Sequence, residues 1–254
     1  MGIINKIVEK IKGEKTLRTE KDENKVLTLT EGPDGLSVKF NGITYSRRNA
    51  KNIFTRSYWD YFTPLPLLFE NPEILMIGLG GGTIVYQLNK LYNKKVKMDV
   101  VEIDKKMVDI AKDFIKDDIK KIDIFVEDGI EFLKMNKKRY NLLFLDAYDG
   151  DKIPDEFLEE SAIETMDKSL SEEGILAINY AMSFKAIVFL QNYINKLKKH
   201  FKVFLVSNPL GSGNTIILCS KIMDKKEILE KINRMKTSDD NFHVIKGYNN
   251  MSNG

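Results

Sequence analysis

The chain has 254 residues, of which 43% are hydrophobic and 10% aromatic, enough apolar material for one large domain with a small appendage. Its 40 basic and 37 acidic residues leave a formal net charge of +3, which argues against a general nucleic-acid-binding surface. No apolar run approaches the roughly 18 residues of a membrane span, and a single cysteine, Cys219, excludes an internal disulfide. The first residues contain no apolar signal core, so we expect a cytoplasmic protein.

Residues 1–52 are predicted to form a small N-terminal domain. The first twelve residues place aliphatic side chains on one face of a helix. These are Ile3, Ile4, Ile7, Val8 and Ile11. From about residue 16 to 49, short alternating runs are separated by the turn sequences Gly32-Pro33-Asp34-Gly35 and Asn41-Gly42. Such runs and turns are typical of antiparallel hairpins, so a small β-sheet is expected after the helix.

A nucleotide-binding βαβ pattern occupies residues 74–104. An apolar run of strand length ends in a glycine-rich turn, a helix-compatible segment follows, and a second apolar run ends in Glu102. Glycines let the backbone bend sharply and come close to a ligand, and an acid at the tip of the second strand can accept both hydrogen bonds of a ribose diol. We therefore expect a nucleoside to be bound by Gly78, Gly80, Gly82 and Glu102.

Other cofactor classes are less well supported by the sequence. Thr83 stands where a dinucleotide-binding fingerprint has a third Gly or Ala, and no Tyr-Lys or His-based hydride apparatus is evident, which disfavours an NAD-dependent oxidoreductase. His200 and His243 lie late in the chain and are expected at the surface. No Cys/His cluster has the spacing of a metal site, so no metal is predicted.

Strand-like and helix-like segments alternate along the rest of residues 53–238. The aromatic segment 53–69 is expected as a helix broken near Pro64. Seven strands are expected at residues 74–77, 96–101, 122–126, 140–145, 175–179, 203–206 and 215–219, the last two as an antiparallel pair. Helices are expected at residues 83–92, 107–115, 130–135, 155–170, 183–200 and 224–235. This order predicts a doubly wound, mostly parallel seven-stranded α/β sheet, followed by a loose polar tail at residues 239–254.

Four successive strands of this predicted sheet end in a glycine or an acid. These residues are Gly78, Glu102, Asp128 and Asp146. Ligands of doubly wound sheets bind outside the carboxyl ends of the strands, so the four residues are expected to meet in one crevice.

The motifs GLGGGT, VVEID, VEDG, LDAYD and EEGILAINY, in this order, resemble the spermidine synthase family. These are the aminopropyltransferases built on the class I S-adenosylmethionine-dependent, methyltransferase-like Rossmann fold. The resemblance covers most of the chain, including the small N-terminal sheet. Its most specific part is the acid–x–x–acid pair after the fourth strand, Asp146 and Asp149.

The resemblance implies roles for the acids of the crevice. Glu102 is expected to hold the ribose, Asp128 with Gly129 the adenine, and the glycine turn the tail of the nucleoside. Asp146 and Asp149 are expected to bind the attacking amine, with Asp146 as the base and Asp149 as the anchor. The resemblance also implies a homodimer or homotetramer that involves the N-terminal region.

The chain departs from the family pattern around the expected amine pocket. Gly81 stands where the family motif GGGDG has its aspartate, and Tyr45 replaces a glutamine of the N-terminal hairpin region. The Tyr-His-Glu sequence of the family is expected to correspond to Phe54-Thr55-Arg56. Of these residues, Tyr45, Phe54 and Arg56 are substrate candidates, together with Tyr148 and Tyr180.

Three functions remain open from the sequence. The first is transfer of an aminopropyl group from decarboxylated S-adenosylmethionine to a di- or polyamine, a step of polyamine biosynthesis. The second is a methyltransferase that uses S-adenosylmethionine on an unidentified acceptor. The third is a non-catalytic homologue that binds a nucleoside.

Overall fold

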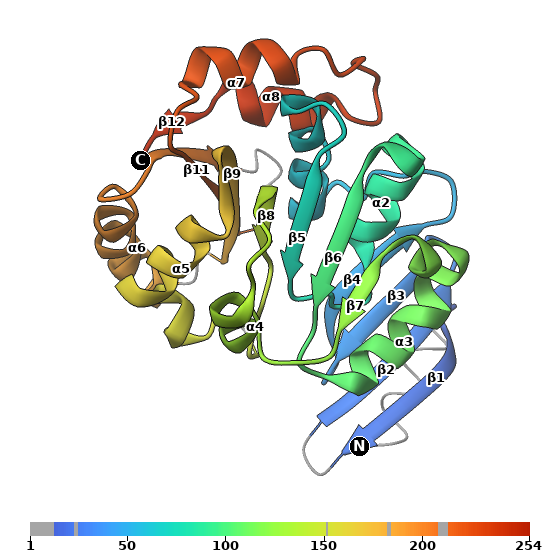
Figure 1. Cartoon of the computed structure of the whole chain (residues 1–254). Helices are drawn as coiled ribbons and strands as arrows, with labels where there is room; N and C mark the ends of the chain where they lie inside the picture. The colour runs from blue at the N-terminus through green and yellow to red at the C-terminus, as the bar shows by residue number, and fades with distance from the viewer. Residues whose placement is uncertain (1–12, 23–24, 151, 182–183, 208–212) are drawn as a thin grey trace.

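The computed structural model describes residues 13–22, 25–150, 152–181, 184–207 and 213–254, so the helix predicted for residues 1–12 lies outside the described part. The chain first forms a separate four-stranded antiparallel sheet in the order β1-β2-β3-β4, which confirms the small N-terminal sheet. Its strands are β1 (Lys15–Asp22), β2 (Lys25–Gly32), β3 (Gly35–Phe40) and β4 (Ile43–Asn49). This sheet lies beside α3 (Lys105–Ile115), as Figure 1 shows.

The second sheet has the strand order β12-β10-β11-β9-β8-β5-β6-β7. Its strands are β5 (Glu73–Ile77), β6 (Lys97–Val101), β7 (Asp123–Phe125), β8 (Tyr140–Leu145), β9 (Leu170–Ala181), β10 (Lys202–Ser207), β11 (Asn214–Ser220) and β12 (Ser252–Asn253). Strands β5 to β9 are parallel to one another, whereas β11, β10 and β12 are each antiparallel to their neighbours. The mostly parallel sheet is confirmed, with one strand more than the seven predicted.

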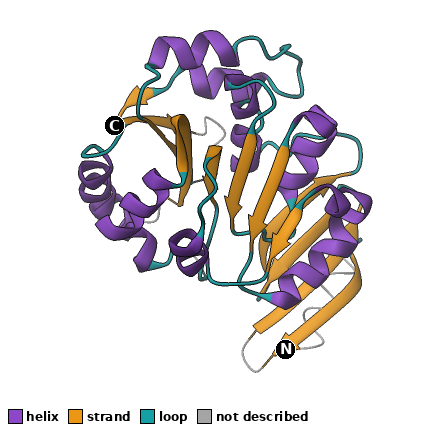
Figure 2. Ribbon diagram, in the orientation of Figure 1, coloured by secondary structure: helices purple, strands orange, loops and turns teal. Residues whose placement is uncertain are grey.

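Both faces of this sheet are buried, because apolar residues occupy both sides of its central strands. In β5, Ile74 and Met76 belong to one hydrophobic cluster, and Leu75 and Ile77 belong to another. Successive side chains of a strand point to opposite faces, so a continuous apolar run requires cover on both sides. Figure 2 shows helices on the two sides of the sheet.

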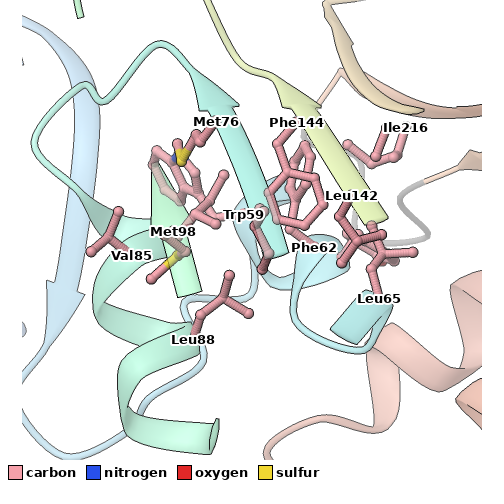
Figure 3. Close-up of a cluster of buried hydrophobic side chains, with 14 of the residues drawn as sticks. Trp59, Phe62, Leu65, Met76, Val85, Leu88, Met98, Leu142, Phe144 and Ile216 are labelled. Carbon is pink, nitrogen blue, oxygen red and sulfur yellow. The ribbon is translucent and has the colours of Figure 1, made fainter. Parts of the chain in front are cut away.

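The two clusters show which helices cover each face. The first cluster is formed with α2 (Thr83–Tyr92), α3, α7 (Lys225–Ile232) and α8 (Phe242–Asn249). The second is formed with α4 (Gly129–Met135), α5 (Glu160–Lys168) and α6 (Phe184–Leu197). The sheet is therefore doubly wound, as predicted. Figure 3 shows the first cluster, where Trp59, Phe62 and Phe144 lie among aliphatic side chains of α2 and the strands.

The aromatic segment before β5 is broken at Pro64, as predicted, but it is helical over fewer residues than the predicted 53–69. It makes two short 3₁₀ helices, η1 (Tyr58–Phe62) and η2 (Leu65–Leu68). Proline lacks an amide hydrogen and cannot continue a helix from the residue before it, which accounts for the break. The segment instead packs its aromatic side chains into the first cluster.

The end of the chain is folded, and the expected loose tail at residues 239–254 is corrected. Helix α8 buries Val244 and Tyr248, and β12 pairs with β10 through Phe204 and Asn253. The surface position expected for His243 is also wrong. The His243 side chain is only 7% exposed, and its Nε2 lies 2.8 Å from a carboxylate oxygen of the fully buried Asp60.

The helices of the described residues include none that is both long enough and apolar enough to cross a membrane.

Candidate functional site

A cavity of about 840 Å³ lies at the carboxyl ends of β5, β6 and β8. The chain runs outward from β5 to β7 and then returns to β8 on the other side of β5, so the strand order reverses at the β5/β8 pair. Such a reversal leaves a crevice above the strand ends where ligands of this fold class bind. Residues of the N-terminal hairpin, including Phe40, Ile43 and Tyr45, form another wall of the cavity.

The glycine turn after β5 is held against the loop after β8. Gly78 has a φ of 89°, and a Cβ atom placed on it would lie 2.4 Å from the backbone oxygen of Asp146. Both the left-handed conformation and the close approach require glycine at this position. Two strand ends are thereby in direct backbone contact at the floor of the cavity.

Glu102 receives three backbone N–H groups at the tip of β6. Its Oε2 accepts hydrogen bonds from Leu79 (2.8 Å) and Gly80 (3.3 Å), and its Oε1 accepts one from Asp104 (3.0 Å). Burial raises the pKa of Glu102, and the three N–H donors partly oppose that rise. A carboxylate has about four acceptor positions, so Glu102 can hold the glycine turn and still accept a ligand hydroxyl.

Asp128 and Gly129 stand at the start of α4, on the same side of the cavity as Glu102. Asp128 caps the helix, since its Oδ1 accepts hydrogen bonds from the backbone of Ile130 (2.8 Å) and Glu131 (3.0 Å). The carboxyl group is exposed, and both residues line the cavity.

Asp146 follows β8 and lies partly buried in the cavity wall. Its Oδ1 accepts a hydrogen bond of 2.7 Å from the side-chain amide of Asn179, and the carboxylate also interacts with the hydroxyl of Tyr58. Burial raises the pKa of Asp146 to about 7; the two hydrogen bonds oppose this rise and the charge of Glu102 adds to it. Asp146 therefore changes its protonation state near neutral pH, as a general base requires.

Tyr58 is a cavity residue that the sequence analysis missed. It belongs to η1, and burial raises its pKa, with a further contribution from the neighbouring Asp146. Tyr58-Trp59-Asp60 has a tyrosine first and an acid last, like Tyr-His-Glu, whereas Phe54-Thr55-Arg56 has neither. The sequence therefore carries a signal for Tyr58.

The loop after Asp146 joins the two sheets. The Tyr45 hydroxyl donates a hydrogen bond of 2.6 Å to the backbone oxygen of Gly150, and the Tyr148 hydroxyl donates one of 2.8 Å to the backbone oxygen of Asn179. Asp149 is exposed at the cavity rim, and its backbone pairs with that of Lys152. Tyr45, Tyr148 and Asp149 therefore line the cavity together.

Four of the predicted site residues lie outside the cavity lining. Phe54 is buried with its ring edge-on to His243, at 6.3 Å between ring centres. Arg56 is exposed, and its backbone N–H is bound to Asp60 at 2.7 Å. Gly82 occupies the N-cap of α2.

The fourth is Tyr180, which is buried and stacked on Tyr193 at 6.2 Å. Its neighbour Asn179 lines the cavity, and adjacent residues of a strand point to opposite faces, so Tyr180 faces the second hydrophobic cluster. The placement of this residue contradicts the expectation that it flanks the substrate.

The cavity lining is strongly acidic although the whole chain is slightly basic. Eight carboxyl side chains line it, against two lysines, Lys25 and Lys134. The acids are Glu102, Asp104, Glu127, Asp128, Glu131, Asp146, Asp149 and Glu156. Such a concentration of one charge attracts a cationic ligand and raises its local concentration.

Comparison with known proteins identifies similar families and folds. The family model described as "Spermine/spermidine synthase domain" matches residues 56–231. A polyamine aminopropyltransferase of Clostridium beijerinckii is 30% identical over 175 residues, which is 65% of this chain and 60% of that protein. The chain therefore spans about three fifths of the length of this relative.

Two solved structures share the fold at 19% sequence identity. Spermidine synthase from Thermotoga maritima has a TM-score of 0.69, with 92% of this chain and 84% of that chain covered. Human methyltransferase-like protein 13, in complex with SAH, has a TM-score of 0.58, with 76% and 92% covered. Both comparisons support the methyltransferase-like fold.

Proposed function

Because the chain belongs to the spermine/spermidine synthase family, we propose that it transfers an aminopropyl group from decarboxylated S-adenosylmethionine to a di- or polyamine. The observation that carries this proposal is the position of Asp146. This residue has a pKa near 7 and lies in an acidic cavity, in backbone contact with the glycine turn that would hold the donor.

The donor would lie along the carboxyl ends of β5, β6 and β7. Glu102 would accept a ribose hydroxyl, and Asp128 with Gly129 would face the adenine. In this arrangement the sulfonium lies near Gly78, next to Asp146. The backbone contact between Gly78 and Asp146 would hold the donor and the amine in position for in-line attack, which would lower the entropic part of the barrier.

The reaction forms a bond between the amine nitrogen and the carbon next to sulfur, while the carbon–sulfur bond breaks. Its electron pair goes to sulfur, so the sulfonium leaves as a neutral thioether. The amine attacks only after losing a proton, which Asp146 accepts. A primary ammonium has a pKa of about 10.4 and an ordinary aspartate about 3.9, a mismatch of roughly 6 units. The pKa of about 7 of Asp146 reduces that mismatch to roughly 3 units, about 4 kcal/mol.

The remaining wall residues would hold the rest of the acceptor. Asp149 at the rim is placed to pair with a second ammonium group, and Tyr58 and Asn179 keep the Asp146 carboxylate oriented. A cation with two or more amino groups suits the spread of acids in the lining.

A second donor, S-adenosylmethionine itself, is favoured by the surroundings of Gly81. The backbone N–H of Gly81 donates to the Ser46 hydroxyl at 2.7 Å, and a Cβ atom added to Gly81 would lie 2.6 Å from Val38 Cγ2. No acidic side chain can therefore occupy this position, where its charge would repel the carboxylate that distinguishes S-adenosylmethionine from its decarboxylated form. Methyl transfer from the carboxylated donor is the alternative activity.

The proposal is tested by incubating the protein with either donor and a panel of di- and polyamines. Wild-type protein is expected to form the aminopropylated amine, and Asp146→Asn to lower kcat/KM by at least 100-fold, the usual scale for a lost general base. Asp155→Asn is the matched control, because Asp155 is a nearby exposed acid that pairs with Lys152 outside the cavity.

Calorimetry with the two nucleosides decides the donor. A preference of more than tenfold for the carboxylated form, about 1.4 kcal/mol, would reject aminopropyl transfer in favour of methyl transfer. Nucleoside binding without transfer to any amine of the panel would leave a non-catalytic homologue. A cytoplasmic location and a homodimer or homotetramer stay predictions from the sequence.

A further inference from the structure

A row of side chains leads from Asp146 to the start of β11. The Asn179 amide nitrogen donates to Asp146 Oδ1 at 2.7 Å, and the Asn214 amide nitrogen donates to Asn179 Oδ1 at 2.8 Å. All three residues line the cavity. β9 and β11 are paired, and Asn214 lies two positions along β11 from Ile216, the partner of Asn179.

We propose that Asn214 is a positioning residue, which fixes the Asn179 amide with its NH₂ group toward Asp146. The inference rests on the proposed function, in which Asp146 is the base, but it concerns a residue to which that function gives no role. Asn214 acts only through Asn179 and is not itself a catalytic residue.

The argument follows from the two ends of an amide group. An Asn side chain carries a donor and an acceptor that can exchange places by rotation about one bond. With its NH₂ toward Asp146, Asn179 stabilises the ionised carboxylate. With its oxygen toward Asp146, it would stabilise the protonated acid instead. Asn214 offers a donor to Asn179 Oδ1, so it selects the first orientation.

The other groups that face Asp146 do not set this orientation. Tyr58 of η1 donates to the carboxylate, Glu102 at the end of β6 repels its charge, and Tyr148 of the same loop lies close enough to interact. Each acts on Asp146 directly. The pKa of Asp146 therefore depends on Asn214 only through the Asn179 amide.

The test replaces the donor at position 214. Asn214→Leu removes the donor at similar volume, and Asn214→Asp offers an acceptor in its place. Thr215→Val is the matched control, because Thr215 is the next residue of β11 and points to the opposite face. The pKa of Asp146 is measured by ¹³C NMR of its carboxyl group, assigned by its loss in Asp146→Asn.

We expect the pKa of Asp146 to rise by about one unit in Asn214→Leu, a tenfold loss of the ionised form below that pKa. It should rise further in Asn214→Asp, where a new negative charge adds to the effect. Where transfer is observed, the acid limb of the kcat/KM profile should move to higher pH by the same amount. Thr215→Val should leave both unchanged.

An unchanged pKa of Asp146 in a folded Asn214 variant would overturn the inference, even if the melting temperature fell. If neither variant folds, the same question is tested in the wild type. The NMR signals of the side-chain NH₂ groups of Asn179 and Asn214 must then both shift as Asp146 titrates. Constant Asn214 signals would overturn the inference. Because the NMR readout needs no turnover, failure of the proposed function would show separately, as absence of transfer by the wild type.

Discussion

At the residue scale, the contribution of Asp146 to the stability of the folded protein depends on its protonation state. An ordinary aspartate has a pKa of about 3.9, as in the unfolded chain, whereas that of folded Asp146 is about 7. Between these values the folded state binds the extra proton, so its stability falls as pH rises through this interval. The shift of roughly three units corresponds to at most about 4 kcal/mol.

We therefore predict that Asp146→Asn becomes more stable relative to the wild type as pH rises from about 4 to 7, because its side chain stays neutral. Urea unfolding at several pH values measures the difference. Asp155→Asn should show a change below about 1 kcal/mol, as expected for an exposed ion pair. If the wild type instead became more stable relative to Asp146→Asn as pH rises over this interval, folding would lower the pKa of Asp146.

Some site residues could be predicted because the chain itself places them at strand ends. Glu102 and Asp146 directly follow apolar runs, and parallel strands bring their carboxyl ends to one edge. Tyr58 could not be placed this way, because it follows no strand: it lies in the short 3₁₀ turn of η1, where its hydroxyl interacts with Asp146. Only its place in the sequence order points to Phe54 as a site residue, and its apolar ring is buried in the core.

At the element scale, the docking of α8 depends on Asp60. The carboxylate accepts hydrogen bonds from the backbone of Thr55 and Arg56 and from the Gln87 amide, and contacts His243 of α8. Helix α8 has eight residues and no side-chain cap at its start. Because a helix this short is not stable alone, tertiary contacts must hold it in place.

Asp60→Asn should cost about 3 kcal/mol of stability, because an amide presents a donor where the carboxylate accepted. Amide hydrogen exchange in α8 should also be faster in Asp60→Asn, which mass spectrometry of peptides would measure. Asp240→Asn is the control, since Asp240 bonds Asn52 at the exposed surface and should change stability by about 0.5 kcal/mol or less. Unchanged exchange in α8 would show that this helix is held by its apolar contacts alone.

At the scale of the whole molecule, a side-chain hydrogen bond links the N-terminal sheet to the loop after β8. The Tyr45 hydroxyl of β4 donates to the backbone oxygen of Gly150, and the Tyr45 ring packs on Phe40 with ring centres 5.2 Å apart. Tyr45 and Gly150 both line the cavity, so we expect this hydrogen bond to affect how long a bound nucleoside stays.

Tyr45→Phe is expected to cost about 1 kcal/mol of stability and to speed nucleoside release, measured by stopped-flow fluorescence. Tyr92→Phe loses a similar bond, from its hydroxyl to the Thr63 backbone oxygen at 2.7 Å, outside the cavity. It should reduce stability by a similar amount and leave the release rate unchanged. Equal release rates in both variants would remove Tyr45 from any role in retaining the ligand.

The overall fold was largely predictable, because the apolar runs and the helical segments alternate clearly. The eighth strand was not, since Ser252 and Asn253 are polar and their pairing is set by β10, about fifty residues earlier. Helix α8 was missed for a related reason. Its stability comes from contacts with η1 and β10 rather than from its own sequence pattern.

The backbone contact between Gly78 and Asp146 has a consequence for redesign of the protein. Main-chain atoms set the spacing between the glycine turn and Asp146, so we expect substitutions elsewhere in the lining to leave that spacing intact. Acceptor preference can then be altered through the loop beyond Ala147 and the hairpin that carries Tyr45. A library confined to those two segments would explore new amines while the reacting geometry stays constant.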